Sequence, residues 1–129
     1  MARGYERFGT AVVVQASVAI AAAAFSGGTQ TEFDKTASGN ADGAFSAEIE
    51  IDVTAWTADA RCEVYQEAKQ HDGAGYAFPK LVGSVAVTQV DKYTVIVDGL
   101  SEKGLITLKA ITTGFTASAS FRSIYPADA

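Results

Sequence analysis

The chain has few of the residues from which catalytic and metal centres are usually built. Its 129 residues include one cysteine, Cys62, and one histidine, His71. A single cysteine excludes an internal disulfide, and one Cys with one His cannot supply the ligands of a typical zinc site. A nucleophilic triad needs a base beside its nucleophile, whereas Cys62 falls in an expected strand and His71 in a polar loop. We therefore expect Cys62 to be a small buried apolar residue, and we expect no catalytic residue, no metal site and no cofactor.

Basic residues and long apolar runs are also scarce. Ten Lys and Arg stand against fifteen Asp and Glu, which gives a net charge of −5. Non-specific nucleic-acid binding depends on many cationic side chains, so this balance argues against a nucleic-acid partner. The apolar run Ala11–Phe25 is interrupted by Gln15 and Ser17 and is shorter than the roughly 20 residues of a membrane helix. It superficially resembles a signal peptide, but we expect it to belong to the folded domain, and we expect no membrane partner.

What is present is a two-residue rhythm of apolar and polar side chains, clearest in residues 43–53. The apolar positions are Phe45, Ala47, Ile49, Ile51 and Val53, and the polar positions between them are Ser46, Glu48, Glu50 and Asp52. Successive side chains of a strand point to opposite faces, so this segment is predicted to be a strand with one apolar and one acidic face. An antiparallel sheet can meet water on one side in this way.

The same rhythm continues along the chain. Pro79 has no N–H to donate, so Tyr76–Val82 should be an edge strand or an extended connection. Thr10–Phe25 is interpreted as one long strand or two strands with a bend near Gln15, with a helix over Gln15–Phe25 as the alternative. Thr54–Asp59 is expected to be a connection. Further strands are predicted at Ala60–Ala68, Ser84–Val90, Lys92–Asp98, Leu105–Ile111 and Phe115–Tyr125, with a short one at Thr29–Phe33.

These strands, separated by turns, predict an all-β fold. We expect an antiparallel β-sandwich of immunoglobulin-like or jelly-roll-like form. Apolar residues make up 48% of the chain and charged residues 19%, a composition typical of a globular domain. A chain of this length can bury a core without metal or disulfide. We therefore expect a single domain, residues 10–129, preceded by an N-terminal arm, residues 1–9.

The acidic face raises the question of carboxylate chemistry. Glu48, Glu50 and Asp52 would share a face with Glu63 and Glu67 if the two strands were neighbours. A glycosidase needs two carboxylates about 5 to 9.5 Å apart in a cleft, but neighbouring exposed strand positions give such distances without any cleft. We interpret this as a solvated face, with a surface for a basic partner and a catalytic pair as the alternatives.

Large side chains near the N-terminus and at strand ends mark candidate interfaces. The arm carries Arg3, Tyr5, Arg7 and Phe8 before any regular pattern begins, either as a frayed terminus or as a segment that orders on a neighbouring subunit. Exposed aromatic side chains are common at interfaces, so we predict these four residues and Trp56 as a partner interface. The other aromatic residues near expected strand ends, for which core packing is the main alternative, are Phe25, Phe33, Tyr65, Tyr76, Phe78 and Tyr125.

Several segments between Phe45 and Tyr125 carry a family resemblance. They are Ile-Glu-Ile-Asp-Val-Thr-Ala (49–55), Cys-Glu-Val-Tyr-Gln-Glu (62–67), Asp-Gly (72–73), Leu-Val-Gly-Ser-Val (81–85), Lys-Tyr-Thr-Val-Ile-Val-Asp-Gly-Leu (92–100), Leu-Ile-Thr-Leu-Lys-Ala (105–110) and Phe-Thr-Ala-Ser-Ala-Ser-Phe (115–121). In this order they resemble the small β-sandwich decoration, or cement, proteins of tailed-bacteriophage capsids. Residues 1–44 lie outside the resemblance, and it transfers no individual functional residue.

The resemblance implies a non-enzymatic virion structural protein on the outer surface of the capsid. Its partner would be the major capsid protein. The chain is also expected to form a homo-oligomer, and a trimer on the shell is compatible with the resemblance. Open sheet edges and an N-terminal arm suit strand addition to a neighbour. Two alternatives stay open: a phage tail-tube or tail-tip subunit that forms rings, and a carbohydrate-binding adhesive module, which would present two or three coplanar exposed rings.

Overall fold

The computed structural model describes residues 6–8, 11–34, 46–69 and 75–126. Within these ranges there is no helix, and therefore none long and apolar enough to cross a membrane. The prediction of an all-β chain is confirmed. The strands are β1 (Glu6–Phe8), β2 (Val12–Ile20), β3 (Phe33–Asp34), β4 (Ser46–Trp56), β5 (Ala60–Lys69), β6 (Lys80–Val87), β7 (Asp91–Asp98), β8 (Lys103–Ile111) and β9 (Phe115–Pro126).

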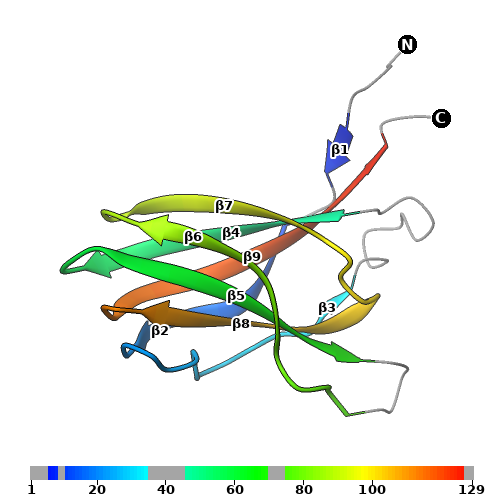
Figure 1. Ribbon diagram of the computed structural model, residues 1–129. Coiled ribbons are helices and arrows are strands. Elements are labelled where there is room, and N and C mark those ends of the chain that lie inside the picture. The colour runs from blue at the N-terminus through cyan, green and yellow to red at the C-terminus, as the bar shows by residue number, and fades with distance from the viewer. Residues whose placement is uncertain (1–5, 9–10, 35–45, 70–74, 127–129) are drawn as a thin grey trace.

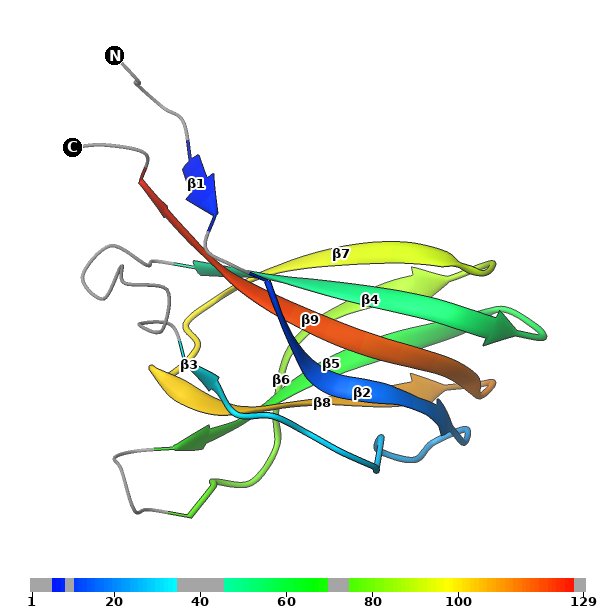
Figure 2. The same cartoon turned by 180° about the vertical axis from the view of Figure 1, so that it is seen from behind.

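The strands form two antiparallel sheets that pack face to face (Figures 1 and 2). Sheet A has the order β1-β9-β4-β7, with β2 also paired to β9, and sheet B has the order β3-β8-β5-β6. From β2 onward, every connection except the β5–β6 hairpin crosses from one sheet to the other. Eight strands in the order β2-β9-β4-β7 over β3-β8-β5-β6 make a jelly roll. The predicted antiparallel sandwich is confirmed, and the topology selects its jelly-roll form over the immunoglobulin-like one.

The core lies between the sheets and is built from the apolar positions of the sequence rhythm. Phe33 of β3 stacks on Phe121 of β9 with ring centroids 5.1 Å apart, which joins the two sheets across the core. Burying one large apolar side chain contributes about 1.5 to 3 kcal/mol, so this shared layer holds the sandwich together. The fully buried residues include Ile49, Ile51 and Val53 of β4, Cys62 and Val64 of β5, Ile106 and Leu108 of β8, and Ala117 and Ala119 of β9.

Several predicted boundaries differ from the structure, and a bulge lies at two of them. The short strand predicted at Thr29–Phe33 is Phe33–Asp34, and the strand predicted at Ser84–Val90 ends at Val87. β4 continues to Trp56, so the first three residues of the connection predicted at Thr54–Asp59 belong to the strand. Its pairing with β9 shifts register between Val53 and Ala55, which interrupts the alternation there. β6 is one strand where the sequence predicts two pieces on either side of Gly83, and its pairing with β5 shifts register next to Gly83.

β2 is one long strand whose pairing is irregular near Gln15, the place where the sequence allows a bend. Its pairing with β9 shifts register on both sides of Gln15, between Val13 and Gln15 and between Gln15 and Val18. β2 then runs on to Ile20 as a strand, so the alternative of a helix over Gln15–Phe25 is wrong. Gln15 itself is fully buried, and a buried amide must find hydrogen-bond partners.

Residues 22–31 supply those partners and close one side of the sandwich. This segment, between β2 and β3, bonds to β2 at the edge of sheet A and to β8 of sheet B, beyond the short pairing of β8 with β3. On β2, the N–H of Ala16 donates to the segment at 2.9 Å and the carbonyl of Val14 accepts from it at 3.0 Å. On β8, the carbonyls of Leu108 and Ala110 accept from it at 2.6 and 2.7 Å. Covering an edge with a loop is a common way to prevent further strand pairing.

A series of buried hydrogen bonds that involve side chains joins the same segment to the core. Gln15 Nε2 donates to the carbonyl of Gly27 at 2.8 Å, and Ser26 Oγ donates to Gln15 Oε1 at 3.0 Å. The N–H of Leu108 in turn donates to Ser26 Oγ at 3.0 Å. Gln15 interrupts the apolar run of the sequence because its buried amide binds the segment that covers β2.

Candidate interaction surfaces

Cys62 has no nucleophilic chemistry in this fold. Its side chain is fully buried, and burial raises the pKa of its thiol to about 12. Because the thiolate is the reactive form, the neutral thiol serves as a small apolar core residue, as predicted. The part of the chain that the structure describes contains no group of three or more His, Cys, Asp and Glu side chains that could hold a metal ion. His71 lies outside that part.

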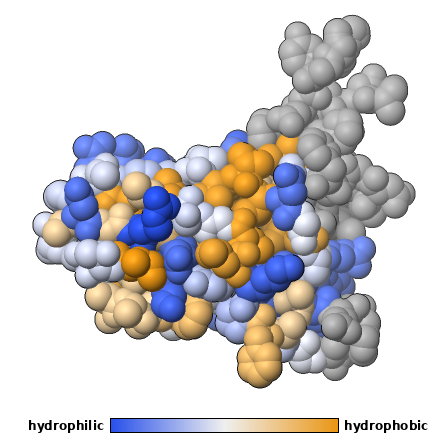
Figure 3. Space-filling model, in the orientation of Figure 1, coloured by the Kyte–Doolittle hydropathy of each residue, from blue (hydrophilic) through white to orange (hydrophobic). Residues whose placement is uncertain are grey.

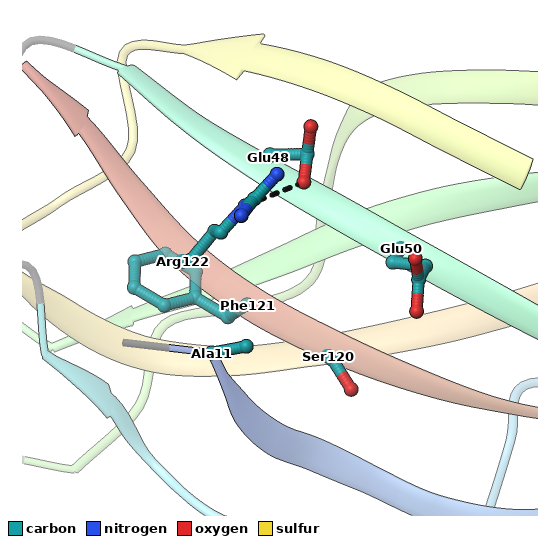
Figure 4. A pocket seen from close by; sticks show the side chains of 6 residues that line it. All are labelled: Ala11, Glu48, Glu50, Ser120, Phe121 and Arg122. Atoms are coloured by element: carbon teal, nitrogen blue, oxygen red, sulfur yellow. Dashed lines mark hydrogen bonds and ion pairs between the residues drawn. The ribbon is translucent and has the colours of Figure 1, made fainter. Parts of the chain in front are cut away.

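The acidic positions of β4 lie on the outer face of sheet A. Arg122 of β9 is directly opposite Glu48, and its Nε donates to Glu48 Oε1 at 2.7 Å (Figure 4). With Glu50 and Ser120 they line a shallow hollow of about 160 Å³. The ion pair occupies the carboxylate of Glu48, so the hollow offers no pair of free carboxylates for acid–base chemistry. A partly solvated charged face describes it best.

The sequence places Glu63 and Glu67 on this face only if β5 is a neighbour of β4, and the strand order shows that it is not. β9 and β7 flank β4, whereas β5 belongs to sheet B. Glu63 and Glu67 therefore lie on the other sheet. Glu63 accepts a hydrogen bond of 2.7 Å from the hydroxyl of Tyr65, which raises the pKa of that phenol.

The side of the sandwich opposite residues 22–31 is left unpaired by the strands that the structure describes. Among the described strands, β7 pairs only with β4, and β6 pairs only with β5. β7 matches β4 over eight consecutive positions, Asp91–Asp98, with no register shift. Its other edge therefore presents a regular row of backbone N–H and C=O groups. An edge of this kind is a ready template for pairing with another chain.

Apolar side chains are exposed along the same side. Ile96 on β7 and Val90 just before it are each 55% exposed, and Leu81 on β6 is 50% exposed. Figure 3 shows apolar side chains gathered on this face, over the region where β6 passes β7. Proteins often protect edge strands with proline, bulges or charges. β6 has a bulge, but β7 has neither bulge nor proline, and its charged residues stand near its two ends at Asp91–Lys92 and Asp98.

A separate apolar side chain projects from the connection between β5 and β6. Phe78 is 93% exposed, although the segment that carries it is anchored. Tyr76, two residues earlier, forms a β-bridge with Lys69, and its hydroxyl donates to Glu32 Oε2 at 2.7 Å. That bond, together with one from Lys69, lowers the pKa of the Glu32 carboxyl. The anchored segment around Tyr76 therefore holds the Phe78 side chain in solvent.

Trp56 lies at the opposite end of the sandwich, where β4 ends and β9 begins. It pairs with Phe115, and both line an apolar hollow of about 370 Å³ together with Ile20. The indole Nε1 of Trp56 is buried and has no hydrogen-bond partner among the described residues. Buried donors are rarely left unpaired, and no acceptor for this one lies among the residues that the structure describes.

Of the five residues predicted as an interface, the structure describes three, and Trp56 lies far from Arg7 and Phe8 along the sheet. Arg7 and Phe8 lie on β1, which pairs with the last residues of β9, whereas Trp56 pairs with the first. Some nine residues of strand, about 30 Å, separate the two places. The segment 6–8 of the predicted arm is thus a strand of the chain's own sheet. Arg3 and Tyr5 fall outside the described ranges, and the role of all five in binding stays a prediction.

Aromatic placement gives no support to a sugar-binding platform. Phe25 and Tyr65 meet edge to face, with ring planes at 81° and centroids 5.0 Å apart, and Lys109 lies over the Phe25 ring. These rings are not coplanar. Phe33 is buried in the core.

Sequence reasoning did not single out Phe78 among the aromatic residues, nor β7 among the strands. Phe78 is one of several aromatic residues near strand ends, and only its neighbours Ala77 and Pro79 hint at a projecting, extended segment. The open edge of β7 has no local signal at all, because it depends on which strands pair.

No protein-family model matches the chain, and no curated protein does. One solved structure with some likeness comes from Bacillus endospore appendages, which form a family of disulfide-linked pili; the identity is 12% and the TM-score 0.46, over 99% of this chain and 96% of that one. Another is the crystal structure of PirA, with 13% identity and a TM-score of 0.37, over 97% of this chain and 95% of that one. Because both TM-scores lie below 0.5, we draw neither fold nor function from them.

Proposed function

We propose that this chain is a non-enzymatic structural subunit of an outer-surface assembly with many copies, and that it binds its neighbours through the open edge of β7. The observation that carries this proposal is the contrast between the two sides of the sandwich. Residues 22–31 close one side, whereas β7 leaves a regular edge beside the exposed side chains of Val90 and Ile96. Strand addition at such an edge gives affinity through backbone hydrogen bonds, and neighbouring side chains give specificity.

The specific assembly that we propose is a bacteriophage capsid, with the chain bound to the major capsid protein on its outer surface. The sequence resemblance is the reason for choosing this assembly. A net charge of −5 suits a partner surface with basic residues. Many copies on one particle let contacts of modest strength hold firmly, and contacts between copies would make the chain a homo-oligomer on the shell.

Co-sedimentation with shells of the major capsid protein from the same genome tests this proposal. We expect the wild-type chain to pellet with the shells and to stay in the supernatant without them. Ile96→Lys should reduce the bound amount, because it places a charge beside the open edge. Val13→Lys is a matched control: Val13 is also a β-branched edge-strand residue with 55% of its surface exposed, but β2 lies on the closed side.

Other outcomes would redirect or refute the proposal. Equal loss of binding in Ile96→Lys and Val13→Lys would remove β7 as the binding edge. A wild-type chain that never pellets with shells would refute capsid decoration. Closed rings formed by the chain alone would favour the tail-tube alternative.

A further inference from the structure

We propose that copies of this chain contact one another head to tail, with Phe78 of one copy seated in the Trp56 hollow of the next. The Trp56 hollow is the apolar depression lined by Ile20, Ala55, Trp56 and Phe115. The inference rests on the proposed function, because it concerns copies that an assembly already holds in an array.

The two surfaces lie at opposite ends of the molecule. β5 begins at Ala60, just after the turn beside the hollow, and ends at Lys69, which bridges to Tyr76 near Phe78. Ten residues of strand span about 30 Å. In Figure 1 the β4–β5 turn lies at the left tip, and the β5–β6 connection lies at the lower right. A contact between different patches at opposite ends cannot close on itself in a dimer; it continues along a row or closes a larger ring.

The chemistry of the two surfaces is complementary. Phe78 offers a ring that is 93% exposed, and the hollow offers about 370 Å³ of largely apolar space. Pro79 restricts the backbone after Phe78 and keeps the segment that carries the ring extended.

The charges around the two surfaces also match. Lys80 follows Phe78 by two residues, and Asp59 lies two residues beyond Thr57 on the rim of the hollow; both are exposed. Head-to-tail docking places these opposite charges near each other. A side-by-side pairing of two identical ends would instead place Lys80 near Lys80 and Asp59 near Asp59, which is unfavourable.

The contact is small and therefore needs an array. A stable interface between free proteins buries about 1,600 Å² in total, far more than one aromatic ring supplies. Between copies already held on a shell, each weak contact is effectively intramolecular, so its free energy adds to the binding of the array. We therefore expect weak association of the free chain and marked association of neighbouring copies on a particle.

Trp56, the only tryptophan in the chain, reports directly on the hollow. The acceptor is the full chain with Phe78→Ala, which keeps Trp56 but has no ring to insert. The donor is the full chain with Trp56→Phe, which keeps Phe78 and emits no tryptophan fluorescence. The control donor carries Trp56→Phe and Phe78→Ala together. We expect the acceptor's emission to shift to shorter wavelength, with saturation, as the donor is added, and to stay constant with the control donor.

Three outcomes overturn the inference: no shift up to millimolar donor, an equal shift with both donors, or a shift that does not saturate. Should Trp56→Phe fail to fold, charge reversal in the otherwise wild-type chain replaces it. Asp59→Lys and Lys80→Glu should each weaken concentration-dependent sedimentation, roughly two- to fivefold, and their mixture should recover it. Equal behaviour of the single variants and the mixture would contradict head-to-tail contact.

Failure here is distinct from failure of the proposed function. If wild-type chain pellets with capsid shells while Trp56 emission stays constant, the head-to-tail contact is wrong and decoration stands. If emission shifts but no shell binding occurs, the contact stands and capsid decoration is wrong.

Discussion

Ser26→Ala tests whether buried hydrogen bonds hold the closed side of the sandwich. Ser26 Oγ donates to Gln15 Oε1 and accepts from the N–H of Leu108, both at 3.0 Å. Gln15 is fully buried and Ser26 is 8% exposed. Alanine preserves the size of the side chain closely, but it leaves one amide oxygen and one backbone N–H without a partner inside the protein.

The expected loss of stability follows from those two groups. A buried polar group left without a partner costs about 1 to 3 kcal/mol, so two groups should cost about 2 to 4 kcal/mol after partial relaxation. This is a large fraction of the roughly 5 to 15 kcal/mol that stabilises a typical domain. With a urea m-value of about 2 kcal/mol/M, the unfolding midpoint should fall by about 1 to 2 M.

Urea unfolding followed by circular dichroism measures this loss. Ser84→Ala is the control, because the Ser84 hydroxyl accepts from Arg61 at an exposed site and its removal should cost less than about 0.5 kcal/mol. The double variant Gln15→Leu with Ser26→Ala should lose less than the sum of the two single variants, since they share a bond. A Ser26→Ala midpoint equal to that of Ser84→Ala would refute the reasoning.

Three further predictions concern close packing, burial and local charge. Gly104→Ala should destabilise the fold by about 1 to 3 kcal/mol, because the new Cβ would lie 2.5 Å from a β5 backbone carbonyl oxygen. Gly27→Ala is the control: a Cβ there would meet nothing within 4 Å, so this variant should be nearly neutral. Thermal unfolding of both variants measures the difference. Cys62 should resist thiol reagents at pH 8 in the native chain and react only after unfolding. Because its pKa is about 12 when folded and near 8.5 when unfolded, its contribution to stability is full below about pH 8.5 and should decline at higher pH, at up to about 1.4 kcal/mol per pH unit; Cys62→Ala should lack this component. The Glu32 carboxyl should titrate by NMR below its ordinary pKa, so the stability it contributes is lost as pH falls, and Tyr76→Phe should move the titration back upward; an unchanged titration in that variant would contradict the assigned hydrogen bond.

The sequence by itself determined the strands and their buried faces. Alternation of polarity is a local property, and any strand with Ala47, Ile49, Ile51 and Val53 on one side must bury that side against something. The same reasoning placed Cys62 in the core, which is confirmed, and allowed a bend near Gln15, where the pairing of β2 shifts register. It misplaced element boundaries at the end of β4 and within β6, where bulges break the period without leaving a turn residue to mark the break.

Only the tertiary structure decided which strands are neighbours, and every candidate surface depends on that choice. Strand order placed Glu63 and Glu67 in the sheet away from Glu48 and left the edge of β7 open. It also set Phe78 and Trp56 at opposite ends of one molecule. Pairing between distant segments is decided by the packing of the whole core, and a period-two pattern fits any partner strand equally well. The local pattern therefore specifies what each strand buries, while the global packing specifies what the assembled sandwich leaves exposed.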